Sequence, residues 1–293
     1  MILVTGGTGR VGYRLLEGLR DAGADATVMV RVEAAAADLP GSFQHVVATL
    51  DEPPPADVLA GFDQVFLLSP AGPAQAELEI GFTDALRAAG HGPHVVKVAC
   101  DGFAEPDCDV RFMRSHREVA VHLEASGLPA SYLAAAPYCE NLLLSAAALR
   151  REGLLRTATG PGRAAFIAAS DVAAAATRLL TGDRPEPGTY VLTGPEALSG
   201  ADVAHRISAV FGRHVAFRDV PPERARENLR AAGLTDWAAD GMLELQRWIR
   251  DGGSDTVTPA VRNLTGQDPR PVEDWLDAFR ADFLDPEDEI RSV

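Results

Sequence analysis

Short apolar runs alternate with amphipathic stretches along the first two thirds of the chain. Residues 64–68 (QVFLL) are almost continuously apolar, as expected of a strand that is buried on both faces of a sheet. Several amphipathic stretches end at a glycine, namely Gly23, Gly90 and Gly127, which is typical of a helix stop. The pattern predicts strands at residues 2–5, 26–30, 46–48, 64–68, 94–99, 130–134 and 189–192, and helices at 10–22, 77–89, 114–126, 170–180 and 199–211.

This alternation predicts an α/β fold, a Rossmann-type doubly wound parallel sheet with helices on both faces. After about Pro137 the rhythm loosens, and from Val215 onward the segments are short, interrupted by prolines and expected to be helical. Ser199 and Asp202 have the spacing of a helix capping box. We expect a dinucleotide-binding domain at residues 1–137 and 165–194. A smaller, mostly helical C-terminal lobe for the substrate is expected at 138–164 and 195–293.

A glycine-rich segment, TGGTGRVG, separates the first predicted strand from the first predicted helix. Its glycines fit both GxGxxG and GxxGxxG, and glycine is needed there for the turn and for close approach of the backbone to a pyrophosphate. The alternative is an ordinary glycine-rich turn, but the strand before it and the helix after it favour a dinucleotide site. The loop residues assigned to the cofactor are Thr5, Gly6, Gly7, Thr8, Gly9, Arg10, Val11 and Gly12.

The choice between the two nicotinamide dinucleotides is expected at the end of the second strand. Arg31 stands there, where an arginine suits a 2′-phosphate and an acidic residue would suit the ribose hydroxyl. Arg10 adds a second cation, whereas the nearby Glu33 weakens the case, and Arg31 could instead be a solvated strand end. We expect NADP(H) in preference to NAD(H).

The remaining cofactor residues are expected at the carboxyl ends of later strands, where ligands bind in such sheets. They are Leu68, Ser69, Pro70 and Cys100, together with His116 on the following helix. Cys100 could instead be a small buried hydrophobe, and His116 a histidine on a helix surface.

The Tyr-x-x-x-Lys dyad of short-chain dehydrogenases is absent from the chain. Its one lysine, Lys97, has Pro93 four residues earlier, and Phe112 stands where the tyrosine would fall. Phenylalanine cannot donate a proton, so acid catalysis from that position is lost.

Several segments together resemble the NmrA-like branch of the atypical short-chain dehydrogenases. They are TGGTGRVG (5–12), SHREVAVHLEASGL (115–128), PYCENLL (137–143), FIAASDVA (166–173), YVLTGPEALS (190–199) and VTPAVRNLTGQDPRPVEDW (257–275). The resemblance implies that His116 lies near the nicotinamide ribose and that Tyr138 and Asn141 border the substrate cleft. One departure is Ala136-Pro137, where most relatives have Arg-Pro, and it puts the substrate in doubt.

Two functions are open at this stage. The first is an NAD(P)H-dependent reductase that transfers hydride directly to a conjugated acceptor, quinone-like or aromatic, such as a natural-product intermediate. The alternative is a non-catalytic NADP(H)-sensing regulator with a protein partner. For the reductase, His116 is assigned a catalytic positioning role, and the substrate residues are Phe103, Phe112, Tyr138, Asn141 and Trp237.

The net charge and the cysteine content narrow the range of possible ligands and partners. The formal net charge of −15 argues against nucleic acid and anionic membranes. Cys100, Cys108 and Cys139 show no CxxC spacing and fit no zinc pattern with His91 and His94, so we expect free thiols in the cytoplasm and no metal. A first strand at residue 2 leaves no room for a signal peptide, and no apolar run is long enough to span a membrane. A homodimer is left open.

Overall fold

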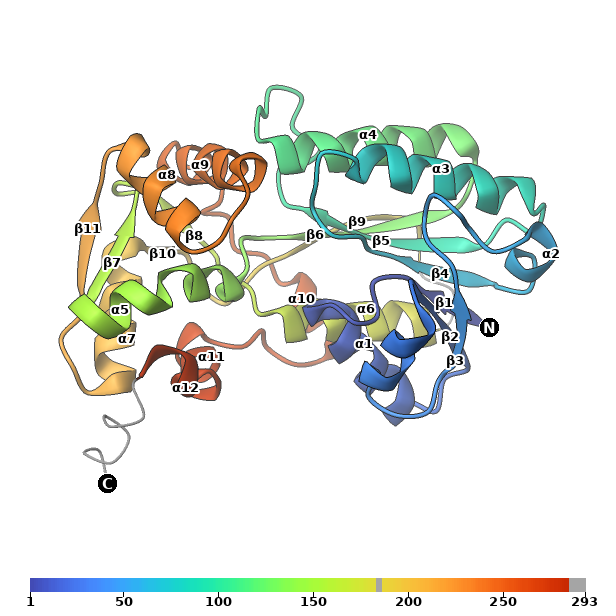
Figure 1. Ribbon diagram of the computed structural model, residues 1–293, viewed down its shortest axis with the longest axis horizontal. Helices are drawn as coiled ribbons and strands as arrows, with labels where there is room; N and C mark the ends of the chain where they lie inside the picture. Colours follow the sequence, from blue (N-terminus) through green and yellow to red (C-terminus); the bar gives the residue numbers. More distant parts are fainter. Residues whose placement is uncertain (183–185, 285–293) are drawn as a thin grey trace.

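The computed structural model describes residues 1–182 and 186–284, and within them a seven-stranded parallel sheet forms the centre of the molecule (Figure 1). Its order, β3-β2-β1-β4-β5-β6-β9, contains the Rossmann arrangement, so the predicted fold class is confirmed. The strands are β1 (Ile2–Val4), β2 (Ala26–Val30), β3 (Gln44–Val47), β4 (Gln64–Leu67), β5 (His94–Cys100), β6 (Ala130–Ala135) and β9 (Gly188–Leu192).

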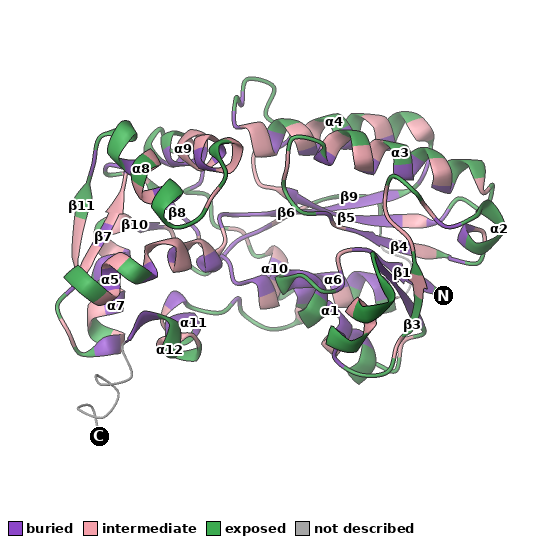
Figure 2. Cartoon of the chain, in the orientation of Figure 1, coloured by how far each residue is buried: buried purple, intermediate pink, exposed green. Residues whose placement is uncertain are grey.

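Helices cover both faces of this sheet. On one face lie α1 (Arg10–Asp21), α6 (Ala169–Thr181) and α10 (Ala260–Thr265), and on the other α3 (Gln75–Ala88) and α4 (Arg111–Ser126) (Figure 1). The short α2 (Ala56–Leu59) and the 3-10 helix η1 (Glu33–Asp38) lie in connections. The central strands are buried between the two helical layers (Figure 2).

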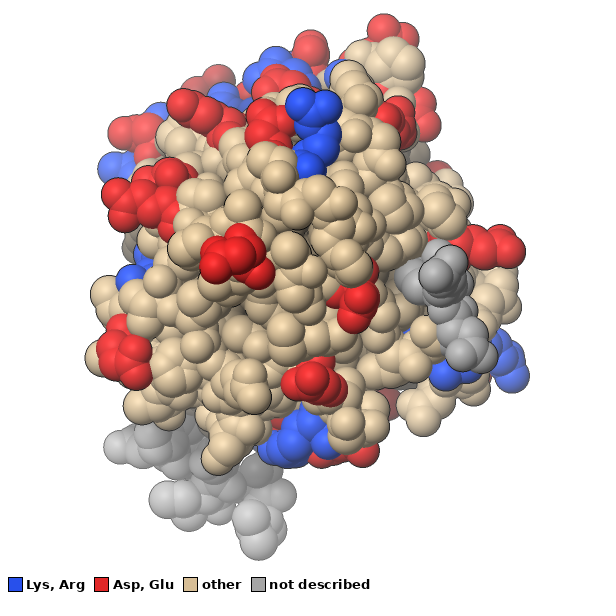
Figure 3. Space-filling model, turned by 90° about the vertical axis from the view of Figure 1, so that its right-hand side faces the viewer, with Lys and Arg blue, Asp and Glu red and all other residues tan. Residues whose placement is uncertain are grey.

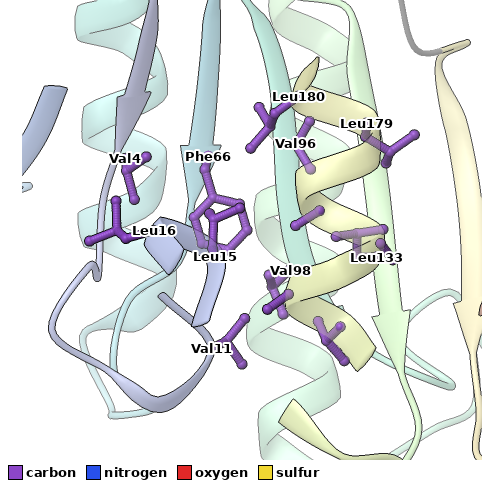
Figure 4. Packing of buried hydrophobic residues seen from close by; sticks show 14 of the residues in the cluster. Val4, Val11, Leu15, Leu16, Phe66, Val96, Val98, Leu133, Leu179 and Leu180 are labelled. Atoms are coloured by element: carbon purple, nitrogen blue, oxygen red, sulfur yellow. The ribbon is translucent and has the colours of Figure 1, made fainter. Parts of the chain in front are cut away.

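The core beneath α1 and α6 shows why these segments fold as predicted. Leu15, Leu16 and Leu19 recur at helical spacing, and all three are completely buried against strand residues such as Val4 and Phe66 (Figure 4). Burying each leucine contributes about 1.5–3 kcal/mol, which fixes α1, and hence the glycine loop before it, on the sheet.

A second lobe follows β6 and occupies the left side of Figure 1. It packs around the buried Trp275 and holds two small two-stranded sheets, β7 with β11 and β8 with β10. Its elements are η2 (Cys139–Ser145), α5 (Ala146–Glu152), β7 (Leu154–Thr157), β8 (Arg163–Ala164), β10 (Leu198–Ser199), α7 (Gly200–Phe211), β11 (Ala216–Asp219), α8 (Pro222–Ala231), α9 (Asp236–Arg250), α11 (Val272–Ala278) and α12 (Arg280–Phe283).

Three local expectations are corrected and one is confirmed. The segment after Val215 begins with a strand, β11, because it pairs in parallel with β7. β3 begins two residues earlier than expected, and α4 begins at Arg111 rather than Arg114. The capping box is present, since the Ser199 side chain accepts from the Asp202 amide and the Asp202 carboxylate accepts from the Ser199 amide.

Two surface properties bear on partners. None of the helices in the described part of the chain combines the length and apolar character needed to cross a membrane. The face at the β3 and α2 end carries scattered acidic and basic side chains separated by uncharged surface, and no basic patch gathers on that face (Figure 3).

Candidate active site

The glycine loop is tied to the carboxyl end of β4 through Thr5. Its Oγ1 lies 2.9 Å from the Leu68 carbonyl oxygen and accepts from the Leu68 amide at 2.8 Å. Gly6 adopts a left-handed φ of +66°. Among the predicted cofactor residues, Thr5 uses its side chain to hold the glycine loop against the end of β4. These hydrogen bonds bring Leu68 beside the loop.

Gly12 and Gly9 of the loop are required for different reasons. A Cβ on Gly12 would lie 2.1 Å from the Gly6 carbonyl oxygen, so Gly12 is required by the fold. A Cβ on Gly9 would approach only that same oxygen, at 3.3 Å, and Gly9 is exposed with an ordinary φ of −81°. The protein therefore leaves the space over Gly9 open.

The N-terminus of α1 opens onto that space. Gly9 is the N-cap, no side chain caps the helix, and its first turn contains no acidic residue. Helix-terminal amides without a cap, combined with the helix dipole, attract an anion. These residues fit a dinucleotide pyrophosphate.

Two arginines near this end are free to meet a further phosphate. Arg10 and Arg31 are exposed, and within residues 1–182 and 186–284 neither guanidinium takes part in a hydrogen bond or ion pair. Glu33 is engaged elsewhere, since its Oε1 lies 2.9 Å from His45 Nε2.

A buried polar network, which sequence reasoning missed, lies behind the carboxyl edge of the sheet. Ser69 Oγ donates to Glu79 Oε1 at 2.7 Å, Glu79 Oε2 lies 3.0 Å from Lys97 Nζ, and Lys97 Nζ lies 3.1 Å from His116 Nδ1. All four residues are buried, so the Ser69 side chain points into the protein. The available signal was a lysine inside the apolar strand HVVKVAC, because a buried charge requires a partner.

Three titratable side chains at this edge, His116, Cys100 and Tyr138, are neutral at neutral pH. Burial, and then the charge of Lys97, holds the pKa of His116 well below its ordinary value. Burial raises the pKa of the Cys100 thiol to about 12, and burial, then Cys100 and Glu140, raises the pKa of Tyr138. Cys100 and Tyr138 are therefore poor proton donors.

The predicted substrate residues fall into three places. Phe112 of α4 packs edge-on against Trp237 of α9, with ring centroids 5.3 Å apart, where the two lobes meet. Phe103 lies in the core, packed on Tyr132. Tyr138 and Asn141 follow β6, with Tyr138 half-buried.

Asn141 lines a pocket in the second lobe, between η2, β7, α8 and α9. It measures about 660 Å³ including space open to solvent, and it reaches Pro137, two residues beyond β6. Its lining is mainly apolar, including Leu142, Leu155 and Ile249. The polar groups are Asn141, Ser145, Arg156, Thr157, Thr159, Asn228 and Gln246, and the charge of Arg156 is paired with Glu152. Such a composition suits an uncharged organic ligand.

The described residues show no grouping of three His, Cys, Asp or Glu side chains that could hold a metal ion. The three cysteines are unpaired.

The strand order, the glycine loop and the uncapped α1 terminus together define a Rossmann protein with a dinucleotide site. The family model described as NmrA-like matches residues 1–276, and the chain belongs to this family.

Some of the relatives and solved structures match nearly the whole chain. An NAD(P)H azoreductase of Xenophilus azovorans is 32% identical over 286 residues, covering 97% of this chain and 99% of its own. A (4-alkanoyl-5-oxo-2,5-dihydrofuran-3-yl)methyl phosphate reductase of Streptomyces griseus is 32% identical over 296 residues, covering 98% and 100%. The NADPH complex of an NADPH-dependent quinone oxidoreductase from Escherichia coli has a TM-score of 0.86 at 23% identity, covering 96% and 100%, and so shares the fold.

Proposed function

We propose that this protein is an NAD(P)H-dependent reductase that transfers a hydride directly to a conjugated acceptor, quinone-like or aromatic. The observation that carries the proposal is the open cradle over Gly9 at the uncapped N-terminus of α1, in a chain whose relatives are named reductases. Bound NAD(P)H supplies the hydride, and the chain supplies orientation and exclusion of water.

The choice of acceptor class is supported by three side chains that are poor proton donors. Phe112 has no proton to give, and the raised pKa values of Cys100 and Tyr138 make both weak acids. An isolated alkoxide would need a nearby acid, whereas a conjugated acceptor places the charge on a stabilised oxygen that water can protonate. We place the apolar part of the acceptor next to Pro137, in the mainly apolar pocket that Asn141 lines.

NADP(H) is the preferred cofactor in this proposal. Arg31 and Arg10 are exposed and unpaired in the part of the chain that the structure describes, and Glu33 is bound to His45. A 2′-phosphate would give Arg31 the charge-assisted hydrogen bonds that it lacks.

The test is oxidation of NADPH by the purified protein with a panel of quinones and azo dyes, followed by the absorbance of the reduced nicotinamide. We expect turnover with at least one acceptor, and Asn141→Ala should raise KM more than it lowers kcat. Tight NADPH binding without turnover of any acceptor would contradict the reductase and support the alternative, an NADP(H)-sensing regulator.

A further inference from the structure

The surroundings of Lys97 fix the position of a proton on His116. Lys97 Nζ is hydrogen-bonded to the Val98 carbonyl oxygen and to His116 Nδ1, and it forms an ion pair with Glu79 Oε2. An ammonium group only donates hydrogen bonds, so Nδ1 must accept. The ring proton of the neutral imidazole is therefore on Nε2.

The alternative charge state of His116 is opposed by the same contact. An imidazolium would carry a proton on Nδ1, directed at the Lys97 ammonium 3.1 Å away. The charged groups that bear on the ring are Lys97 of β5 and, behind it, Glu79 of α3, which balances the lysine. With the ring also buried, its pKa lies well below the ordinary value, and the neutral form persists at physiological pH.

The other ring nitrogen has no partner within the protein. Among the described residues none is hydrogen-bonded to Nε2, and His116 is 7% exposed. It lies in the first half of α4, the helix that follows the carboxyl end of β5. A donor of this kind, on a ring fixed from behind, is suited to a ligand atom that accepts.

We propose that Lys97 locks His116 as a neutral Nε2–H donor, and that this donor binds the carbonyl oxygen of the acceptor. The inference rests on the proposed function. His116 is then a catalytic residue, and Lys97 is a positioning residue that acts through it, with Glu79 and Ser69 holding Lys97 in place.

The chemistry is balanced without proton transfer from His116. As hydride adds to the conjugated acceptor, an electron pair moves to the carbonyl oxygen, and the Nε2–H group stabilises the negative charge there. Water then supplies the proton that completes the hydroxyl group. A neutral imidazole in the same electrophilic role is known from triosephosphate isomerase.

The first test is nitrogen NMR of the histidine rings in the wild-type protein. We expect His116 to show the Nε2–H tautomer and no titration between about pH 5.5 and 8, where a free histidine would titrate. An Nδ1–H tautomer, or a pKa near 6.5, would overturn the inference whether or not any acceptor is reduced. In Lys97→Met/Glu79→Gln, which removes both charges together, the pKa should rise and the tautomer preference should weaken.

The second test separates acceptor from cofactor. NADP⁺ and then 1,4-naphthoquinone are added to the wild-type protein, a pair that cannot react because neither carries a hydride. We expect the Nε2–H resonance to move when the quinone is added. Movement with NADP⁺ alone, and none with the quinone, would assign the donor to the cofactor and overturn the proposal.

The third test is kinetic. His116→Gln should lower kcat with the best acceptor by about 10- to 100-fold, at or below the usual loss for one oxyanion donor, and leave the NADPH Kd within about twofold. The wild-type kcat should not change with pH where His116 does not titrate. A kcat that falls with rising pH along a histidine titration would mean that an imidazolium donates the proton, contrary to the inference.

Discussion

Lys97 and Glu79 form an ion pair at 3.0 Å in the interior, with side chains only 1% and 0% exposed. The pair joins β5 to α3 on the face of the sheet that α3 and α4 cover. Removing two charges from water is costly. Hydrogen bonds support the pair on both sides, from Ser69 to Glu79 Oε1 and from Lys97 to Val98 and His116. Among the described residues, Glu79 Oε2 has the ionic contact with Lys97 but no hydrogen bond.

Removing one charge of the Lys97–Glu79 pair should destabilise the protein more than removing both charges. Lys97→Met leaves the Glu79 carboxylate buried without its cation, and we expect a loss of about 3–5 kcal/mol in the free energy of unfolding, measured with urea. Lys97→Met/Glu79→Gln should recover most of that loss. A double variant as unstable as the sum of its single variants would show that the two charges are not coupled.

Gly9→Val should abolish dinucleotide binding and leave a folded protein. The new side chain would occupy the space over the α1 terminus, and its Cβ would meet only the Gly6 carbonyl oxygen, at 3.3 Å. Calorimetry would report binding and circular dichroism the fold. The control is Gly81→Val on α3, where no atom lies within 4 Å of a Cβ and binding should be unchanged. Tight binding by Gly9→Val would contradict the assignment of the loop.

Arg31→Ala should weaken NADPH binding by about 1.5–3 kcal/mol, the range for hydrogen bonds to charged groups, and barely affect NADH. Arg14→Ala is the matched control, because Arg14 is exposed on α1 and pairs with Glu17 at 2.8 Å. Titration calorimetry with both cofactors separates the effects. Equal losses for NADPH and NADH would show that Arg31 does not read the 2′-phosphate.

The low pKa of His116 makes stability depend on pH. As the pH falls below about 6.5, the unfolded chain binds a proton that the folded chain refuses, so the free energy of unfolding decreases by up to about 1.4 kcal/mol per pH unit. Compared with His116→Gln, the wild-type protein should therefore lose relative stability on acidification. His94, whose pKa burial also lowers, is common to both proteins and cancels in the difference. Parallel profiles of the two proteins would contradict the prediction.

Arg111 should stabilise the contact between the lobes. From α4 it donates to Glu244 of α9 through Nη2 at 2.6 Å and to the Trp237 carbonyl oxygen at 3.0 Å. Burial alone would raise the pKa of Glu244, but the Arg111 hydrogen bonds hold it below its ordinary value. Arg111→Ala should cost about 1.5–3 kcal/mol above pH ~4.5, and less as the pH falls and Glu244 is protonated. Arg87→Ala on α3 is the surface control, and equal effects would refute the role of Arg111.

The sequence by itself determined the features that depend on neighbouring residues. The leucines of α1 recur at helical spacing, the residues of β4 are uniformly apolar, and Ser199 stands three positions before Asp202. Each pattern predicts which face of an element is buried or which amide is capped. The sheet, its helices and the capping box could therefore be predicted. The glycine loop belongs to the same group, because its strand and helix are adjacent to it in the chain.

Contacts between distant segments were decided by the tertiary structure alone. Residues 216–219 become a strand because β7, some sixty residues earlier, offers an edge to pair with, and no local pattern encodes that pairing. Phe103 enters the core while Asn141 reaches a pocket, although both were grouped as substrate residues. The buried polar network joins four successive segments, which contribute Ser69, Glu79, Lys97 and His116. Only folding brings each of these residues within 3.1 Å of the next. The charge and tautomer of His116 depend on that chain, because the ring nitrogen that accepts from the Lys97 ammonium cannot carry the proton of the neutral imidazole.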